Sequence, residues 1–303
     1  MIALLAAAAL ASGLQARTGR APLPAREVER AVVLPRGWWA VDADLSWKRA
    51  AGLWGMEGQR LLRDPAWRTT RLASTVRHGL GRSVELGAQV PWEWATLGEQ
   101  RARTIGDPVI WGRLALVREE PPARSLALEL RHQAPLARWP HGAGAAVWSA
   151  GLIGRVRHGG LRVEAAARAE RWTAGRLREV PSRYRGGGPY WVKPGDRWVM
   201  TTEALYQVGP LWTALRPTVI RRGPLQLGRG PAVFPAEDYL PEVEAGAWTV
   251  DLGSSWGAQL TRGWTVSGGV SGSVVGAGRA FFPTEAIHPA RGRTWRVGVA
   301  CRL

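Results

Sequence analysis

The sequence contains very little cysteine. Cys301 is the only one among 303 residues, so an internal disulfide framework is excluded. Its position on the apolar side of the last strand pattern favours a small buried hydrophobe over a reactive thiol. Spacings typical of metal ligands, phosphate-binding loops or dinucleotide-binding turns are also missing. We therefore expect no cofactor and no metal.

Histidine is scarce as well, with five residues in the chain. Only His132 falls within a predicted strand, while the other four fall in predicted turns and loops. A barrel that hydrolyses lipid would need a serine nucleophile beside a histidine base on its lipid-facing side. No serine lies on the same face of a neighbouring strand at the height of His132. We therefore predict no catalytic residues and no enzyme.

Long hydrophobic runs are missing after the first residues of the chain. Residues 1–16 resemble a secretory signal peptide with cleavage after Ala16, although no Lys or Arg precedes the apolar run. No later run approaches the ~18 apolar residues of a transmembrane helix. Residues 17–36 are rich in Arg and Pro, and we expect a loose periplasmic tail with a turn or two of helix around 25–33. Residues 37–303 would form one domain.

Acidic residues are few, with 24 Asp and Glu against 41 Lys and Arg, which gives a formal net charge of +17. Such a balance can indicate nucleic acid, anionic lipid or an acidic ligand as partner. The sequence has no zinc-finger spacing, no basic helix and no aromatic RNA-binding strand motif, so we expect no nucleic acid.

What the sequence does have is a two-residue periodicity, which is typical of strands with one apolar face. In residues 83–92 apolar side chains at even positions alternate with polar or small ones, and the glycine-containing connection 78–82 joins this stretch to a similar one before it. Each strand has about ten residues, close to the ~9–11 that cross a bilayer. Twelve strands are predicted, at 38–47, 68–77, 83–94, 109–117, 125–133, 145–156, 161–171, 198–207, 211–219, 247–256, 264–274 and 295–303. Residues 161–171 also have helical propensity.

The connections alternate in length. Short ones are expected at 78–82, 118–124, 157–160, 208–210 and 259–263, and long ones at 48–67, 95–108, 134–144, 172–197, 222–243 and 275–293. An even strand number with short turns at one end and long loops at the other is the layout of bacterial outer-membrane barrels. The predicted fold is therefore an all-β, membrane-spanning, antiparallel up-and-down barrel in the outer membrane of a Gram-negative bacterium.

Tryptophan is abundant, with 18 residues against three phenylalanines. Several aromatic residues lie eight apart on the apolar face, which corresponds to ~20 Å along the membrane normal and approaches the distance between two aromatic girdles. Tryptophans of an ordinary core would not sort to strand ends. The predicted membrane-interface belt consists of Trp39, Trp47, Trp92, Trp94, Trp148, Trp198, Tyr206, Trp248, Trp256, Trp264 and Trp295.

The opposite faces of the strands carry charges of both signs and would point into the barrel. The predicted pore-lining residues are Asp42, Asp44, Arg71, Glu85, Arg113, Glu129, Arg131, Arg155, Glu164, Arg168, Glu203, Arg216, Asp251 and Arg296. Two interpretations remain open: they line a wet pore, or they pair across strands as a salt-bridge lattice that stiffens a narrow barrel. Trp38, Trp111 and Trp212 also point inward and could constrict the lumen.

The positive charge that remains falls mainly in the long loops, for example at Arg176, Arg178, Arg183 and Arg185. Arginine pairs well with phosphate oxygens, so loops on the outer side could dock lipopolysaccharide or attract anionic solutes. The alternative is an ordinary solvated loop surface.

Four sets of residues form short motifs at the strand ends and within strands: 34–37 (LPRG), 85–92 (ELGAQVPW), 106–108 (GDP), and 126–135 followed by 142–144 (GAG). These segments resemble the family of outer-membrane transporters associated with the meta-pathway of phenol degradation. The resemblance implies a barrel with an uptake role for small molecules, including aromatic ones, and it assigns no site residue.

The sequence thus predicts an outer-membrane channel or uptake protein for small molecules, and the resemblance implies aromatic or hydrophobic ones. The alternatives are a lipid-hydrolysing barrel and a non-conducting structural or adhesion barrel. The last strand ends at Leu303 on its apolar face, which is close to the usual end of outer-membrane barrels. The expected partners are outer-membrane lipid and lipopolysaccharide, a small-molecule solute and the barrel assembly machinery.

Overall fold

The computed structural model describes residues 26–54, 60–97, 100–120, 124–137, 144–176, 191–224, 226–228, 246–278 and 290–303. The predicted signal peptide (1–16), the first part of the predicted tail (17–25) and the loop arginines Arg178, Arg183 and Arg185 lie outside the described residues. Among the described residues, no helix is both long and apolar enough to cross a membrane.

The described residues form one short 3-10 turn and many strands. The turn η1 spans Glu27–Glu29. The long strands are β1 (Trp39–Trp54), β2 (Arg60–Gly79), β3 (Val84–Leu97), β5 (Val109–Glu120), β6 (Arg124–Gln133), β7 (Val147–His158), β8 (Leu161–Trp172), β11 (Arg197–Val208), β12 (Leu211–Arg222), β14 (Ala247–Gln259), β15 (Trp264–Ala277) and β16 (Ala290–Arg302). The short strands are β4 (Gln100–Ile105), β9 (Gly175–Arg176), β10 (Trp191–Lys193) and β13 (Gln226–Gly228).

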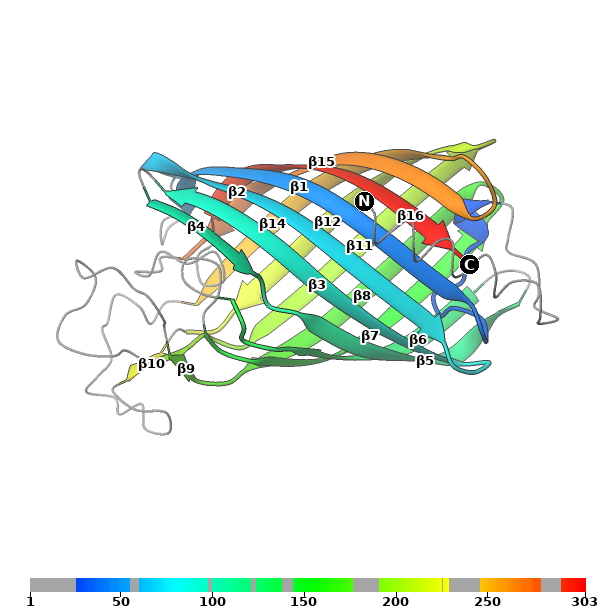
Figure 1. The fold of residues 1–303 in the computed structure, drawn as a ribbon, viewed down its shortest axis with the longest axis horizontal. Coiled ribbons are helices and arrows are strands. Elements are labelled where there is room, and N and C mark those ends of the chain that lie inside the picture. Colours follow the sequence, from blue (N-terminus) through cyan, green and yellow to red (C-terminus); the bar gives the residue numbers. More distant parts are fainter. Residues whose placement is uncertain are drawn as a thin grey trace.

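The twelve long strands form a closed antiparallel barrel, as the sequence predicts. Each pairs with its neighbours in chain order, and β1 pairs with β16 to close the ring. Figure 1 shows the strongly tilted strands, with the short strands β9 and β10 at one end and the C-terminus at the other, where the short turns also lie. We refer to these as the loop end and the turn end. Residues 161–171, for which helix was an alternative, lie in β8 because their outward and inward faces both find partners in the ring.

The strands are longer than predicted at the loop end. The predicted loop 48–67 is largely a continuation of the β1–β2 hairpin, which pairs as far as Trp54 and Arg60. The predicted loop 95–108 contains β4, which pairs with β3. The predicted loops 172–197 and 222–243 contribute β9, β10 and β13 to a separate three-stranded sheet. These extensions lack the apolar alternation, so hydrophobic periodicity alone ends each strand too early.

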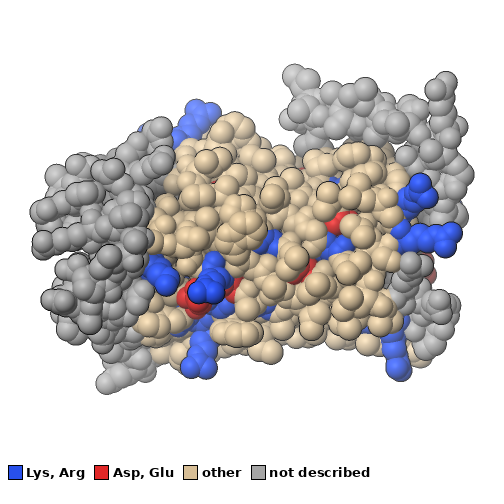
Figure 2. Space-filling view, turned by 90° about the horizontal axis from the view of Figure 1, so that it is seen from below, with Lys and Arg blue, Asp and Glu red and all other residues tan. Residues whose placement is uncertain are grey.

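The wall separates an apolar outside from a charged inside. Outward side chains such as Leu86, Ile110 and Leu252 are exposed, while the alternating inward positions carry most of the buried charges. On the face shown in Figure 2, Lys and Arg protrude near the two ends of the barrel, and the surface between them is mostly uncharged, with a few acidic and basic groups visible in it. This distribution is what a membrane-spanning barrel requires, because the central band of its outer surface contacts hydrocarbon.

Candidate functional site: the barrel lumen

The lumen is the candidate site, because strand parity directs the predicted charged residues into it. One network joins β3, β5 and β6. Arg113 Nε lies 2.7 Å from Glu129 Oε2, and a terminal nitrogen of Arg113 lies 3.4 Å from Glu85 Oε1. Arg131 lies 3.7 Å from the second oxygen of Glu129. The register places Arg113 directly between Glu85 and Glu129, so the pairs form across single rungs of the sheet.

A second network joins β7, β8, β11 and β12. Arg155 lies 2.5 Å from Glu164, and Arg162 lies 2.9 Å from Glu203. Arg216 also donates to Glu203. Glu164 and Glu203 are direct register partners, and two like charges so placed would repel. The three arginines around them offset that repulsion.

The remaining predicted pore-lining residues lie in smaller groups. Asp42 is 2.6 Å from Arg302 and 3.3 Å from Arg77, so it links β16, β1 and β2 at the closure of the ring. Arg71 approaches Glu93 at 3.5 Å, and Arg168 approaches Glu170 at 2.9 Å. Asp44 lies within the field of Arg296, and Asp251 within that of Lys48.

A cavity of about 230 Å³ lies at the centre of the charged networks. It is lined by both signs of charge, including Arg113, Arg168, Glu164 and Glu203. Its volume is enough for several water molecules, each of which occupies ~30 Å³ in the liquid. The interior therefore combines the two interpretations that the sequence left open, since most charges are paired and a polar cavity remains between them.

Residues 26–36 lie inside the barrel near its turn end. Val28 packs in a buried cluster with Leu205 and Ala214, and Val32 and Val33 pack against Ala127 and Ile153. The first cluster lies on β11 and β12 and the second on β6 and β7. The N–H of Leu34 reaches Glu85 of β3, which is five strands from β11 in the ring of twelve, so the segment crosses the lumen. The sequence analysis placed it in a loose periplasmic tail; four apolar residues within an Arg- and Pro-rich stretch, at 28 and 32–34, were the available signal.

Hydrogen bonds from the wall hold the same segment. The N–H of Val28 donates to Gln207 Oε1 at 2.8 Å, and the N–H of Leu34 donates to Glu85 Oε2 at 2.9 Å. In the other direction, luminal arginines donate to the segment's carbonyls: Arg162 to Glu27, Arg113 to Val32 and Arg155 to Arg30. Glu85, Arg113 and Arg155 therefore serve both the wall networks and the segment. Gln207 is a residue that the sequence analysis did not single out.

Burial also acts on the segment's own arginine. Burial lowers the pKa of the Arg30 guanidinium from its usual range, although the nearby Glu27 carboxylate raises it. The two groups are 2.6 Å apart, and Arg30 is 8% exposed. Arginine stays charged at such a shift. The charge of Arg30 inside the lumen is thus balanced by Glu27 of the same segment.

The inward tryptophans Trp111 and Trp212 lie flat on the wall. A Cβ added to Gly87 would come within 2.3 Å of the Trp111 ring, and one added to Gly257 within 2.4 Å of the Trp212 ring. Gly87 is the register partner of Trp111, and Gly257 that of Trp212. Each indole therefore covers a glycine instead of projecting across the lumen, which corrects the idea that these rings constrict it. Arg131 lies 5.7 Å from the centre of the Trp111 ring.

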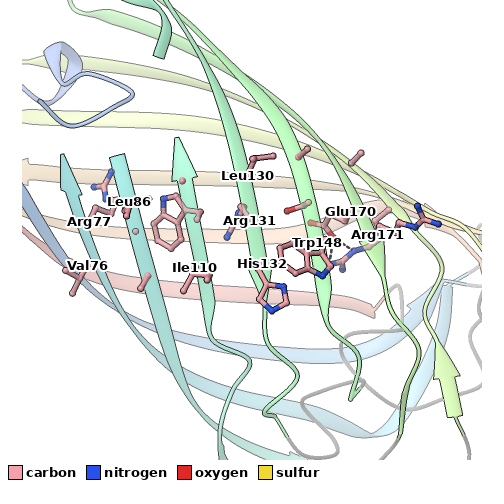
Figure 3. Close-up of a pocket in the computed structure, with 18 of the residues that line it drawn as sticks. Val76, Arg77, Leu86, Ile110, Leu130, Arg131, His132, Trp148, Glu170 and Arg171 are labelled. Carbon is pink, nitrogen blue, oxygen red and sulfur yellow. Dashed lines mark hydrogen bonds and ion pairs between the residues drawn. The ribbon is translucent and has the colours of Figure 1, made fainter. Parts of the chain in front are cut away.

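His132 lies on the outer face, away from the lumen. The centre of its ring lies 4.1 Å from that of Trp148 of β7, with the two ring planes tilted by 35°. Figure 3 shows the two rings beside each other. Its register partners are Ile110 and Trp148, so no serine occupies the neighbouring rungs among the described residues. Among the described register partners of His132, no side chain could act as the serine nucleophile of the lipid-hydrolase alternative. Both side chains line an apolar groove of about 1100 Å³ on the outer wall.

The predicted belt residues also lie on the outer wall. Exposed fractions are 40% for Trp47, 60% for Trp148, 62% for Trp198 and 45% for Trp295 near the loop end. Near the turn end they are 38% for Trp39, 54% for Tyr206 and 53% for Trp256. Trp92 and Trp248 are exposed as well, and Trp94 and Trp264 are half-buried. Their role at the membrane interface stays a prediction.

The fold is similar to that of solved outer-membrane channels. An outer membrane channel from Pseudomonas putida F1 superposes with a TM-score of 0.70 at 11% identity, covering 89% of this chain and 97% of that one. The NanC porin superposes with a TM-score of 0.50 at 10% identity, covering 87% of this chain and 100% of that one. No protein-family model matches the chain, and no curated protein matches it. The protein therefore has the fold of outer-membrane β-barrel channels and porins.

Proposed function

We propose that the protein is a passive channel that admits small solutes across the outer membrane, with residues 26–36 as the closure of its periplasmic end. The observation that carries the proposal is a closed barrel with a polar interior that one short segment crosses. The wall supplies the segment with hydrogen-bond partners that are side chains, such as Gln207 and Glu85. Such contacts can be exchanged for water without unfolding the barrel.

The orientation follows from the connections. Outer-membrane barrels have short turns on the periplasmic side and longer loops outside. The turn end, which holds residues 26–36 and the C-terminus, would then face the periplasm. Solutes would enter between the long loops and meet the charged networks before they reach the segment.

We propose aromatic acids as the solutes. The ring of Trp111 lies at the inner wall with the guanidinium of Arg131 5.7 Å from its centre, and among the described residues its indole Nε1 has no hydrogen-bond partner. A flat ring can stack on an indole, and a guanidinium can pair with a carboxylate on that ring. An aromatic acid such as benzoate is therefore a suitable probe.

The test is the flux of benzoate into vesicles that contain the full-length protein. The double variant Val28→Asp, Val33→Asp places carboxylates against the apolar contacts of the segment, which is unfavourable for an unpaired charge. We expect its flux to exceed that of the wild type several-fold. Ala31→Asp is the matched control, because Ala31 belongs to the same segment and is exposed; its flux should equal that of the wild type.

Two results would contradict the proposal. If the wild type and the double variant both match protein-free vesicles, the barrel is not a channel. If the double variant conducts no better than the wild type, residues 26–36 do not close it. A heat-modifiable gel shift confirms that each variant is a folded barrel.

A further inference from the structure

The charged side chains that the structure describes on the outer face of the barrel are all positive. At the outward strand positions with described side chains there is no Asp or Glu, and eight exposed arginines lie there or at the adjoining strand ends. These are Arg49, Arg68, Arg101, Arg103, Arg124, Arg171, Arg221 and Arg293. All except Arg124 belong to the loop end. A solvated surface would mix both signs, so the one-sided distribution indicates a negatively charged partner at this level.

Three of these arginines form a row across the seam of the barrel. Arg49 of β1 is the direct register partner of Arg293 of β16 on one side and of Arg68 of β2 on the other. The three strands lie side by side in Figure 1. All three side chains are exposed, and none forms a salt bridge with another described residue. We call Arg49, Arg68 and Arg293 the arginine row.

The row is unfavourable by itself. Like charges on directly opposite residues of a sheet destabilise it. Long side chains can separate their head groups, but three guanidinium groups on adjacent strands still repel, and no carboxylate lies among them on the outward face of the described strands. A bound anion would remove the repulsion. The planar guanidinium donates two parallel hydrogen bonds to phosphate, so a phosphate group is the anion that fits.

An apolar groove begins at the row and runs down the wall. Its volume is about 760 Å³, and Arg49, Arg293, Trp295, Val270, Leu252 and Leu215 are among the residues that line it. Gly272 lies between Leu252 and Arg293 in the register, which lowers the floor of the groove. The exposed rings of Trp47 and Trp295 lie one outward position below the row. The arginines that could bind a phosphate thus lie directly beside an apolar groove that could hold hydrocarbon chains.

We propose that the arginine row binds a phosphate of lipid A, the phosphorylated glycolipid of the outer leaflet, with acyl chains in the groove below. The proposal rests on the orientation given under the proposed function, since it places the loop end outside. It does not rest on conduction. Replacing the row leaves the lumen intact, so solute flux is expected to stay unchanged.

The experiment measures lipid retention by the purified full-length protein with native mass spectrometry. The row variant is Arg49→Gln, Arg68→Gln, Arg293→Gln. The matched control is Arg82→Gln, Arg124→Gln, Arg262→Gln, which removes the same charge from exposed arginines at the turn end. The probes are diphosphoryl lipid A, dephosphorylated lipid A, phosphatidylglycerol and inorganic phosphate.

We expect the wild type and the control to retain diphosphoryl lipid A equally. Retention by the row variant should be at least about tenfold lower, because the loss of one charge-assisted hydrogen bond already gives that factor. Dephosphorylated lipid A should bind the wild type as weakly as diphosphoryl lipid A binds the row variant. Equal retention by the row variant and the control would overturn the proposal. So would equal retention of phosphatidylglycerol, or displacement of lipid A by millimolar inorganic phosphate. If the protein retains lipid A but passes no solute, the channel proposal is contradicted and the lipid A proposal is not.

Discussion

At the scale of residues, Glu203 is the acid on which the luminal networks depend most. It is 9% exposed and accepts hydrogen bonds from Arg162 and Arg216. Glu203→Gln should lower the free energy of unfolding by about 3 kcal/mol, the lower end of the cost of breaking a buried pair, because the Arg216 side chain is 42% exposed. Reversible urea unfolding from lipid vesicles measures this change.

The control is Glu164→Gln. The Glu164 side chain is 27% exposed and has Arg155 as its partner, so water can replace part of the lost interaction. We expect a loss of about 1 kcal/mol there. Equal losses of unfolding free energy at the two positions would show that the deeper burial of Glu203 does not increase its contribution to stability. Arg162→Gln in the Glu203→Gln background should recover part of the stability, since it removes one of the uncompensated charges.

Parity identifies the inward residues from the sequence alone, because a strand turns successive side chains to opposite faces. Glu203 and Arg216 are examples. Which residues pair requires the register, since Glu203 could face any base at a similar height on either neighbouring strand. The role of Glu85 was further out of reach. Besides Arg113, it binds the N–H of Leu34, 51 residues away, and the type of amino acid does not show which backbone group a side chain will bind.

At the scale of elements, residues 26–36 are a short segment that the surrounding wall keeps in place. Trypsin reports its position, because Arg36 is exposed whereas Arg30 is buried in the lumen. We expect wild-type protein to be cut quickly after Arg36 and slowly after Arg30. Gln207→Ala removes the acceptor of the Val28 N–H and should speed cleavage after Arg30 by roughly fivefold, which corresponds to about 1 kcal/mol.

Gln133→Ala is the control for this change. Gln133 donates to Asp107 near the loop end, far along the barrel from the segment, so its loss should leave cleavage after Arg30 unchanged. Mass spectrometry of the released peptides distinguishes the two sites. A Gln207→Ala protein that is cut at the wild-type rate would show that this hydrogen bond does not hold the segment.

The elements also show where sequence patterns succeed. The twelve strands follow from alternation, since their outward faces need apolar side chains throughout the hydrocarbon band. Beyond that band the β1–β2 hairpin continues to Trp54 and Arg60 through backbone pairing alone, without any apolar requirement. Alternation therefore cannot mark its end. The fold of residues 26–36 depends on a lumen that exists only once the ring is complete.

At the scale of the whole molecule, the cost of a charged substitution depends on the direction of the side chain. It is high where the side chain faces lipid and low where it faces the lumen. Leu252 is 48% exposed on the outer face midway along β14, and Ser271 faces inward at a similar height on β15. Leu252→Arg should cost about 2–4 kcal/mol if it lies near the midplane, because the charge meets hydrocarbon. Ser271→Arg should cost much less, since the lumen is polar. Equal costs in urea unfolding from vesicles would contradict the assignment of the two faces.

The seam between the first and last strands determines when this molecule becomes complete. The ring closes through Trp39 and Leu303, whose backbone groups exchange hydrogen bonds at 2.8 and 2.9 Å, and through Asp42 and Arg302, which are 260 residues apart in sequence. Contacts of such long range form late in folding, because the loop-closure entropy must be overcome first. A chain that stops before β16 exposes the edges of β1 and β15, and unpaired edges recruit other chains. The thirteen residues of β16 thus make the difference between an aggregation-prone open sheet and a closed ring of strands.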